Sequence, residues 1–349
     1  MTKAAVIGVG AIARQHLLCL RDLPGVEVVA VCDRSPAVAE AACERFGVTA
    51  AYTDHRALLA ATAPDVVHVT TPVNAHLPIA LDALDAGAHV VVEKPITASY
   101  ADTRELIARA ERDGLMLVEN YNYVFNPELQ EVLRLARSGE LGDVTHVEVD
   151  LAVDILGPGS PFTDAAAPHP SASMPGGAIA DFLPHLASLV HYLVGGHRDV
   201  RTIWTRRPGS PLEADELRAL VSAERGSAAI SFSALAQPDA FRLSVHGTRM
   251  RAHVNLFEPR LSIERLRELP GPLVHLLNGL DESRSAGGAA VAGLWRKLAG
   301  RPTAYSGLWA LLARTYEAVA SGGAAPVSLA EIDAVNRLVA DLTRDEQRL

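Results

Sequence analysis

The chain has 349 residues, of which 49% are hydrophobic and 21% charged, a balance typical of a folded protein with room for two domains. Its formal net charge of −9, without any block rich in Lys and Arg, argues against a nucleic-acid-binding surface. No apolar run reaches the roughly 18 residues of a membrane span, and the first strand begins too early for a signal peptide. Three cysteines without metal-site spacing indicate reduced thiols, so we expect a cytoplasmic protein.

An apolar strand, a glycine turn and an acidic residue about 20 positions later open the chain. The strand Ala4–Ile7 leads into Gly8–Ala13 (GVGAIA), and a second strand, Val26–Val31, is followed by Cys32 and Asp33. This order matches the dinucleotide-binding pattern G-x-G-x-x-G, with alanine as the last small residue. The glycines allow a tight turn and close approach of the backbone to a pyrophosphate, and the alanine allows close helix packing. We therefore predict a dinucleotide site here.

The glycine turn also opens a predicted helix, Ala11–Arg21, whose first N–H groups would point at the phosphates. Gly8, Gly10, Ala11 and Ile12 are therefore candidate cofactor contacts.

The residues that follow the second strand bear on which dinucleotide binds. A carboxylate at Asp33 would accept hydrogen bonds from the ribose hydroxyls and repel a 2′-phosphate, which favours NAD. Arg34 could stack on adenine or accommodate that phosphate, so NADP stays possible. The alternative for Asp33 is a residue that only starts a loop.

Strands and helices alternate in about the first 120 residues, which predicts a parallel sheet with helices on both faces. The strands are expected at Ala4–Ile7, Val26–Val31, Val66–Thr70, Val90–Val92 and Met116–Glu119, and the helices at Ala11–Arg21, Pro36–Phe46, His76–Ala86 and Tyr100–Arg112. This pattern predicts an α/β Rossmann domain that binds NAD(P) over residues 1–122.

From residue 123 the pattern changes to strands joined by short turns, which indicates an antiparallel sheet with one covered face. After a helix at Glu128–Ser138, strands are expected at Thr145–Ala152, Val200–Arg206, Leu217–Ala223, Ser227–Ala234, Phe241–His246 and Arg251–Phe257, and helices at Gly307–Ser321 and Leu329–Thr343. We predict an α+β domain for substrate binding and oligomerisation over residues 123–349, with a large, mainly antiparallel open sheet. The open face suggests a homodimer or homotetramer. Gly157–Gly177 and Pro270–Pro302, rich in small residues and proline, are expected to be loops.

Glu93-Lys94-Pro95 follows the strand Val90–Val92. The carboxyl ends of parallel strands open onto the ligand crevice of such a sheet. Lys94 could donate hydrogen bonds there to a substrate oxygen and to the nicotinamide ribose, and Glu93 could pair with it. The alternative is an ordinary surface ion pair.

A second candidate constellation lies in Gly176–His185 (GGAIADFLPH). Asp181 and His185 are four residues apart, so on one helix they face the same way. If Asp181 is the N-cap, Pro184 falls in the first turn, where a missing N–H costs no helical bond. An imidazole beside a carboxylate suits acid–base chemistry near neutral pH. The alternative is a capping Asp and a packed His.

These segments, with Thr71–His76 (TPVNAH) between them, resemble the Gfo/Idh/MocA family of oxidoreductases, the glucose-fructose oxidoreductase and inositol dehydrogenase type. The resemblance covers nearly the whole chain, with the motifs in the family's order. It implies that Lys94 touches substrate and nicotinamide ribose, that Asp181 positions substrate and that His185 is the acid–base partner. It also implies that further residues line the cofactor: Thr71, Pro72, Asn74, His76 and Glu93.

The segment Asn120–Pro127 resembles the family's segment after the last Rossmann strand, and makes Tyr121 and Tyr123 candidate substrate contacts. It departs from the family at Val124, where an Arg is common, so a cationic substrate contact is in doubt. His169, His185 and His191 lack metal-site spacing, so we predict no metal.

The function expected is hydride transfer between NAD(P) and a secondary alcohol or ketone of a polyol-type small molecule: a sugar, cyclitol or nucleotide sugar. Two alternatives stay open. One is an enzyme that keeps NAD bound and oxidises its substrate transiently, for epimerisation or elimination. The other is an NAD(P)-binding sensor without turnover.

Overall fold

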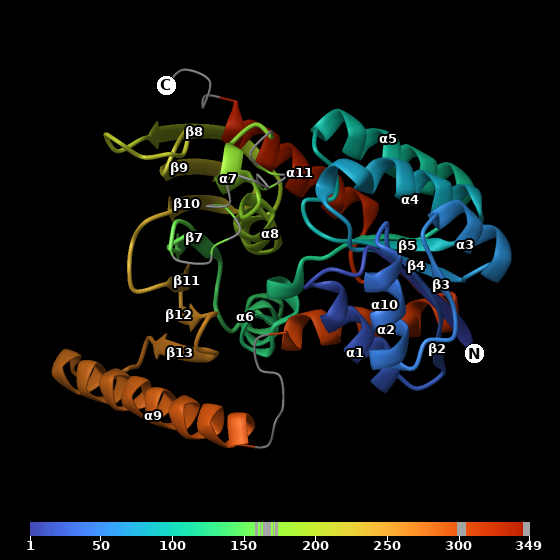
Figure 1. Cartoon of the computed structure of the whole chain (residues 1–349). Helices are drawn as coiled ribbons and strands as arrows, with labels where there is room; N and C mark the ends of the chain where they lie inside the picture. The colour runs from blue at the N-terminus through green and yellow to red at the C-terminus, as the bar shows by residue number, and fades with distance from the viewer. Residues whose placement is uncertain are drawn as a thin grey trace. The chain divides into compact units, whose positions relative to one another are not determined.

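The computed structural model describes residues 1–157, 160, 162, 169, 171, 174–298 and 305–344. Within it the chain forms two compact units (Figure 1). Unit 1 consists of Met1–Asn122 and Leu308–Arg337, and unit 2 consists of Tyr123–Gly307 and Leu338–Leu349. The chain therefore passes from one unit to the other three times, the last time within a helix.

Unit 1 is built on a six-stranded sheet in the order β3-β2-β1-β4-β5-β6, with every pair parallel. Its strands are β1 (Thr2–Ile7), β2 (Val26–Cys32), β3 (Ala51–Tyr52), β4 (Val66–Val69), β5 (His89–Val92) and β6 (Leu117–Glu119). β4 and β6 are buried along their whole length, as strands covered by helices on both faces must be. The predicted parallel sheet is confirmed.

Helices connect these strands and cover the sheet (Figure 1). They are α1 (Ala13–Asp22), α2 (Pro36–Phe46), α3 (His55–Thr62), the short 3-10 turn η1 (Val73–Ala75), α4 (His76–Asp85) and α5 (Tyr100–Asp113). Ser99 caps α5 by accepting the N–H of Asp102, as its spacing predicts. α1 begins at Ala13, two residues later than expected, because Gly10–Ile12 form the turn that precedes it.

Two helices near the end of the chain complete unit 1: α10 (Ser306–Ser321), and α11 (Leu329–Thr343) up to Arg337. Leu308, Leu311 and Leu312 of α10 are fully buried. The sequence pattern predicts that this segment belongs to the second domain, whereas the structure groups residues 308–337 with unit 1. The difference arises because helical periodicity shows which face of a helix is apolar and not which sheet that face covers.

Unit 2 is built on a seven-stranded sheet in the order β13-β12-β11-β7-β10-β9-β8. Its strands are β7 (Val144–Ala152), β8 (His197–Thr205), β9 (Glu216–Ala223), β10 (Gly226–Ser233), β11 (Ala240–Gly247), β12 (Met250–Asn255) and β13 (Arg260–Arg265). All pairs are antiparallel except β7 with β10. The predicted mainly antiparallel sheet is confirmed.

The helices of unit 2 are the short η2 (Asn122–Phe125), α6 (Pro127–Arg137), α7 (Gly177–Ala180), α8 (Leu183–Val194) and α9 (Gly271–Leu298). α8 packs on β7 and β10 and covers one face of the sheet (Figure 1). On β9 the side chains alternate between buried, such as Leu217, and exposed, such as Leu220. The opposite face of β9 is therefore exposed among the described residues.

The most extended difference from expectation is α9, which occupies most of the stretch Pro270–Pro302 that was expected to be a loop. Its first half is bonded to the end of β13 and to the residues that follow this strand. Asn278 Nδ2 donates to Arg265 O at 3.2 Å, and Arg267 forms an ion pair with Asp281. The other expected loop, Gly157–Gly177, lies largely outside the described residues.

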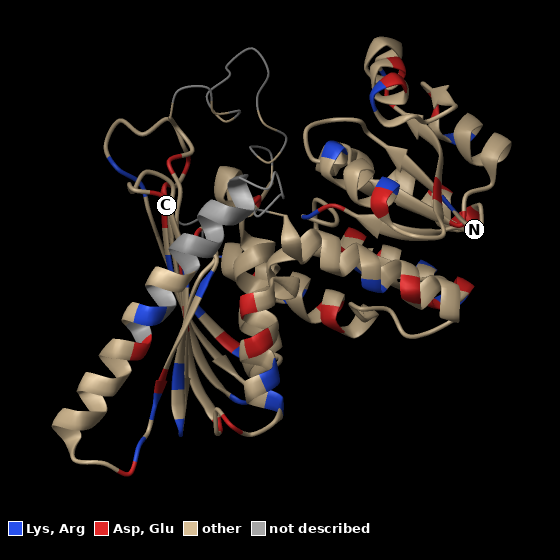
Figure 2. Ribbon diagram, turned by 90° about the horizontal axis from the view of Figure 1, so that it is seen from below, with Lys and Arg blue, Asp and Glu red and all other residues tan. Residues whose placement is uncertain are grey.

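No described helix is both long enough and apolar enough to cross a membrane. Lys and Arg are interspersed with Asp and Glu over the described parts of both units (Figure 2).

Candidate active site

A cavity of about 630 Å³ in unit 1 opens at the carboxyl ends of β1, β2 and β4. Seven of the predicted cofactor residues line it: Gly8, Gly10, Asp33, Arg34, Thr71, Pro72 and Asn74. Several other lining residues were not predicted, among them Thr53, His55, Thr70, Pro78 and Ile79. The predicted residues Ala11, Ile12, His76, Glu93 and Lys94 are not part of this lining.

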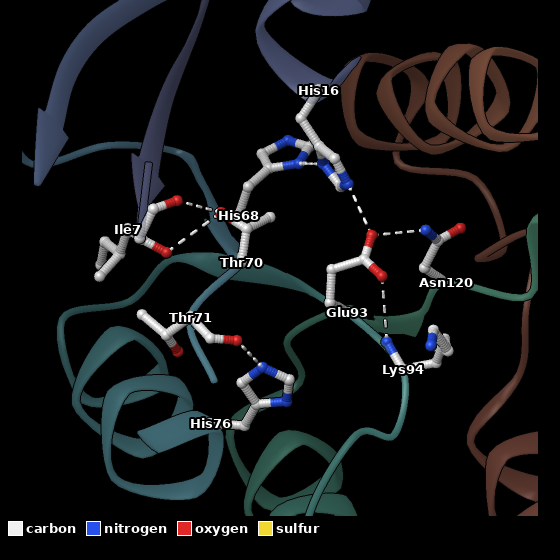
Figure 3. Close-up of polar contacts among 10 residues, drawn as sticks. Ile7, His16, His68, Thr70, Thr71, His76, Glu93, Lys94 and Asn120 are labelled. Carbon is white, nitrogen blue, oxygen red and sulfur yellow. Dashed lines mark hydrogen bonds and ion pairs between the residues drawn. The ribbon is translucent and has the colours of Figure 1, made fainter. Parts of the chain in front are cut away.

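The two glycines of the turn meet different surroundings. Gly8 has φ +88°, and a Cβ there would lie 2.6 Å from both Cγ2 and N of Thr71, so no side chain fits. Thr70 holds this turn, because its hydroxyl donates to the carbonyl oxygen of Gly8 at 2.5 Å (Figure 3). A Cβ on Gly10 would meet no described atom within 4 Å. Gly8 is therefore required by the protein, whereas Gly10 leaves open space beside the cavity.

Asp33 ties the glycine turn to the loop after β2. Its Oδ2 accepts the N–H of Val9 at 2.9 Å, and its Oδ1 accepts the N–H of Ser35 at 3.0 Å. Each carboxylate oxygen has a second lone pair that can accept a ribose hydroxyl. The residue thus starts a loop and still presents acceptors to the cavity.

Two further features fit a dinucleotide. No described side chain caps α1, which leaves its first N–H groups open to an anion such as a pyrophosphate. The hydroxyl of Thr71 is buried and has no hydrogen-bond partner among the described residues. Such an atom at the cavity wall suits a polar ligand, since buried hydroxyls are normally paired.

His76 lies behind the cavity wall, where it is 1% exposed. Its Nε2 is 2.7 Å from the carbonyl oxygen of Thr71, and its Nδ1 is 2.9 Å from that of Pro95. Burial lowers the pKa of His76, although both carbonyl contacts and the charge of Glu93 oppose the shift. The ring therefore joins the loops after β4 and β5, and it is not part of the cavity lining.

Glu93 lies directly after β5 and is 5% exposed. Its carboxylate accepts hydrogen bonds from Asn120 Nδ2 at 2.6 Å, His16 Nε2 at 2.8 Å and the backbone N–H of Lys94 at 3.3 Å (Figure 3). Burial alone would raise the pKa of Glu93, but His16, Lys94 and Asn120 outweigh it and hold the pKa below its usual value. The expected partner of Glu93 was Lys94 alone; His16 and Asn120 were missed.

In unit 2, Asp181 is the C-cap of α7, and α8 has Phe182 as its N-cap. Asp181 is therefore not the N-cap of the helix that carries His185. Gly176 and Gly177, both with positive φ, allow the extra turn α7 to form just before α8. Pro184 still falls in the first turn of α8, as predicted.

The structure brings His185 and Tyr123 together in unit 2. The two rings meet edge to face with centroids 4.8 Å apart, and Tyr123 also contacts Phe241 at 4.8 Å. Burial, with a smaller contribution from Tyr305, raises the pKa of Tyr123 to about 12. The phenol therefore keeps its proton near neutral pH.

Tyr121, the other predicted substrate contact, is fully buried in unit 1. Its hydroxyl donates to Glu119 Oε2 at 2.6 Å, and Asn336 Nδ2 donates to the same oxygen at 2.6 Å. The structure thus shows Tyr121 supporting the end of β6 through Glu119. Among the described residues no group of three or more His, Cys, Asp or Glu could hold a metal ion.

A parallel sheet with a glycine turn, an acidic strand end and a cavity beside them defines the dinucleotide-binding class of α/β proteins. Residues 2–121 match the model of an oxidoreductase family with an NAD-binding Rossmann fold, and residues 129–253 match the GFO/IDH/MocA C-terminal domain. The chain belongs to the Gfo/Idh/MocA family of oxidoreductases.

Relatives support this family and differ in what they act on. A D-apiose dehydrogenase of Paraburkholderia graminis is 36% identical over 140 residues, which are 40% of this chain and 37% of that protein. A dTDP-3,4-didehydro-2,6-dideoxy-alpha-D-glucose 3-reductase of Streptomyces violaceoruber is 35% identical over 203 residues, 57% of each chain. The matched segments cover 37% and 57% of the lengths of these two relatives.

The whole fold is also found in solved structures. A levoglucosan dehydrogenase in complex with NADH and levoglucosan has a TM-score of 0.80 at 18% identity, over 99% of this chain and 97% of that one. At this identity the likeness concerns the fold.

Proposed function

We propose that the chain is an NAD-dependent oxidoreductase that transfers hydride between nicotinamide and a secondary alcohol or ketone of a sugar, cyclitol or nucleotide sugar. The observation that carries the proposal is the cavity bounded by Gly8, Gly10 and Asp33 in a member of this family. The sugar-acting relatives named above support the substrate class. Asp33 favours NAD over NADP, because its charge would repel a 2′-phosphate.

The chain's own residues would bind the substrate and move its proton. When bound, nicotinamide supplies a carbon that accepts or gives hydride. His185 would take the proton of the substrate hydroxyl during oxidation, and Asp181 would hold a neighbouring hydroxyl. Lys94 would stabilise the negative charge that develops on the substrate oxygen.

The test is turnover of a panel of sugars, cyclitols and nucleotide sugars with NAD, followed by NADH absorbance. Lys94→Ala and His185→Ala should each lower kcat by about 100-fold or more, because each removes a group that acts on the reacting oxygen. Lys3→Ala, which changes an exposed lysine of unit 1, the unit that also contains Lys94, should leave kcat unchanged. Activity within a few-fold of wild type in both variants would contradict the assigned roles.

We also propose that the open face of the unit 2 sheet joins two copies of the chain. Ile203 and Leu220 lie on this face and are 65% and 64% exposed, an unusual exposure for large apolar side chains. Arg201 and Arg218 flank them, and Glu216 and Asp199 supply the opposite charge on β9 and β8. Light scattering should give a multiple of the 37.0 kDa chain mass, and Leu220→Glu should lower it. A monomeric wild-type protein would overturn this proposal.

A reducing compartment such as the cytoplasm suits the cysteines. All three are free thiols, and Cys19 and Cys32 are buried. Burial, with a smaller effect of nearby carboxylates, raises the pKa of Cys19 to about 12 and that of Cys32 to about 11, which keeps both unreactive.

A further inference from the structure

Four buried side chains form a continuous chain of polar contacts behind Lys94. They are His16 on α1, His68 on β4, Glu93 after β5 and Tyr316 on α10, and none is more than 5% exposed. Tyr316 Oη is 2.9 Å from His68 Nε2. The two Nδ1 atoms of His68 and His16 are 2.8 Å apart, and His16 Nε2 is 2.8 Å from Glu93 Oε1 (Figure 3). All four ring nitrogens of the two histidines therefore have a partner.

The hydrogen bond between His16 and Glu93 can have only one direction. An ionised carboxylate only accepts, so His16 must carry its hydrogen on Nε2. Burial, with the nearby His16, lowers the pKa of His68 well below its usual value, so His68 is neutral. Burial raises the pKa of Tyr316 far above its usual value, so this phenol keeps its hydrogen.

The remaining bonds can adapt without being lost. In one arrangement, Tyr316 donates to His68 Nε2, and His68 Nδ1–H donates to His16 Nδ1. In the other, both directions are reversed: His16 Nδ1–H donates to His68 Nδ1, and His68 Nε2–H donates to Tyr316. The bond from His16 Nε2–H to Glu93 is the same in both states.

We propose that His16 is a positioning residue, held by His68 and Tyr316, which keeps the Glu93 carboxylate where it fixes the backbone of Lys94. The link is the bond from the Lys94 N–H to Glu93 Oε2 at 3.3 Å. This inference rests on the proposed function, in which Lys94 acts on the substrate oxygen. It adds three residues outside the cavity lining, and all three come from elements that bear none of the predicted site residues: His16 from α1, His68 from β4 and Tyr316 from α10.

Two substitutions at His16 separate this role from simple packing. The side-chain amide of Gln offers an N–H at about the place of Nε2, whereas Leu fills similar space without a donor. His16→Leu should lower kcat by about 100-fold, as expected for a displaced catalytic group, with the KM for NAD changed less than about threefold. The kcat of His16→Gln should be at least tenfold higher than that of His16→Leu, which corresponds to about one hydrogen bond.

A second measurement does not depend on turnover. Amide hydrogen exchange at Lys94 should be about tenfold or more faster in His16→Leu than in wild type or His16→Gln, because Glu93 no longer holds that N–H. The backbone N–H of Asn120 donates to Val92 O at 3.0 Å and serves as the internal control. Its exchange rate should be the same in all three proteins.

Tyr316→Phe is the variant of choice should His16→Leu fail to fold, because it removes a single oxygen from the far end of the chain. It should reduce kcat and speed Lys94 exchange in the same direction, by a smaller factor. His89→Gln, at the opposite end of β5, is the matched control and should change neither quantity.

Equal kcat and equal Lys94 exchange in wild type, His16→Leu and Tyr316→Phe would overturn the positioning role. If wild type turned over no polyol while Lys94 exchange responded as expected, the proposed function would fail and the positioning of Lys94 would stand. Normal turnover that is insensitive to His16 would leave the proposed function in place and remove this inference.

Discussion

Asp33 combines two tasks in one side chain: it holds two backbone N–H groups and presents acceptors to the cavity. Asp33→Asn should weaken NAD binding by about tenfold, because an amide replaces one accepting oxygen by a donor. The ratio of NADP to NAD affinity should rise, because the charge that repels a 2′-phosphate is gone. Titration of both dinucleotides against the protein's fluorescence measures the two dissociation constants.

Asp54→Asn is the matched control for this substitution. Asp54 Oδ1 accepts the N–H of Arg56 at the start of α3, and Asn caps a helix about as well as Asp does. Both dissociation constants should stay at the wild-type values. An unchanged NADP to NAD ratio in Asp33→Asn would show that the aspartate does not select the cofactor.

Other residues of the site differ in how far they could be predicted. The positions of Asp33 and Lys94 follow from a general rule, because the carboxyl ends of parallel strands share one edge of a sheet. The bond between His16 and Glu93 joins residues 77 positions apart, and nothing in the local pattern around His16 marks it. Burial of His76 and Tyr121 likewise depends on which loops pack over them, which a strand-and-helix pattern does not contain.

At the scale of whole elements, Glu119 joins three parts of unit 1: β6, the loop after β5 and α11. Besides Tyr121 and Asn336 it binds the backbone N–H of Ile96 at 3.2 Å. Burial raises the pKa of Glu119 from 4.5 to about 7, against the opposing effect of these hydrogen bonds. The folded protein therefore binds an extra proton between these two pKa values.

This shift predicts a pH dependence of stability. The contribution of Glu119 to the free energy of unfolding is fully present below about pH 4.5 and is lost as the pH rises through about 7. Glu119→Gln lacks a titrating group, so its stability relative to wild type should rise by up to about 3 kcal/mol between pH 5 and pH 8. Urea unfolding of both proteins at four pH values measures this difference.

Glu105→Gln, on the exposed face of α5, controls for the loss of one carboxylate and should follow the wild-type pH dependence. Parallel pH curves for wild type and Glu119→Gln would contradict the raised pKa.

Elements were predictable where their pattern is long and bounded. The main strands of unit 1 are largely apolar runs followed directly by Gly or a polar residue, and their expected limits lie within two residues of those observed. β3 has two residues and α3 has eight, too short for a periodic pattern. α9 was missed because its glycines, including Gly287 and Gly288, each disfavour a helix by about 1 kcal/mol, an effect that the contacts of its first half with β13 oppose.

At the scale of the molecule, the assignment of α10 decides what folds together with the cofactor cavity. The sequence pattern places this helix with the second domain, whereas the contacts within the chain group it with unit 1. The bond between Tyr316 and His68 spans 248 positions and ties the helix to the central strand β4. Unit 1 is therefore discontinuous in sequence, and we expect the stability of its N-terminal sheet to depend on this late segment of the chain.

Hydrogen exchange with and without NAD tests this dependence. A ligand present at about 100 times its dissociation constant stabilises the unit that binds it by about 2.7 kcal/mol, which slows exchange through unfolding of that unit by about 100-fold. The amides of α10 should slow together with those of β1 and β4, whereas those of β13 and α9 in unit 2 should not. Asp33→Asn at the same NAD concentration should show less protection throughout unit 1. If α10 instead followed β13, the helix would belong to the second domain, and the hydrogen bond to His68 would not couple it to the sheet.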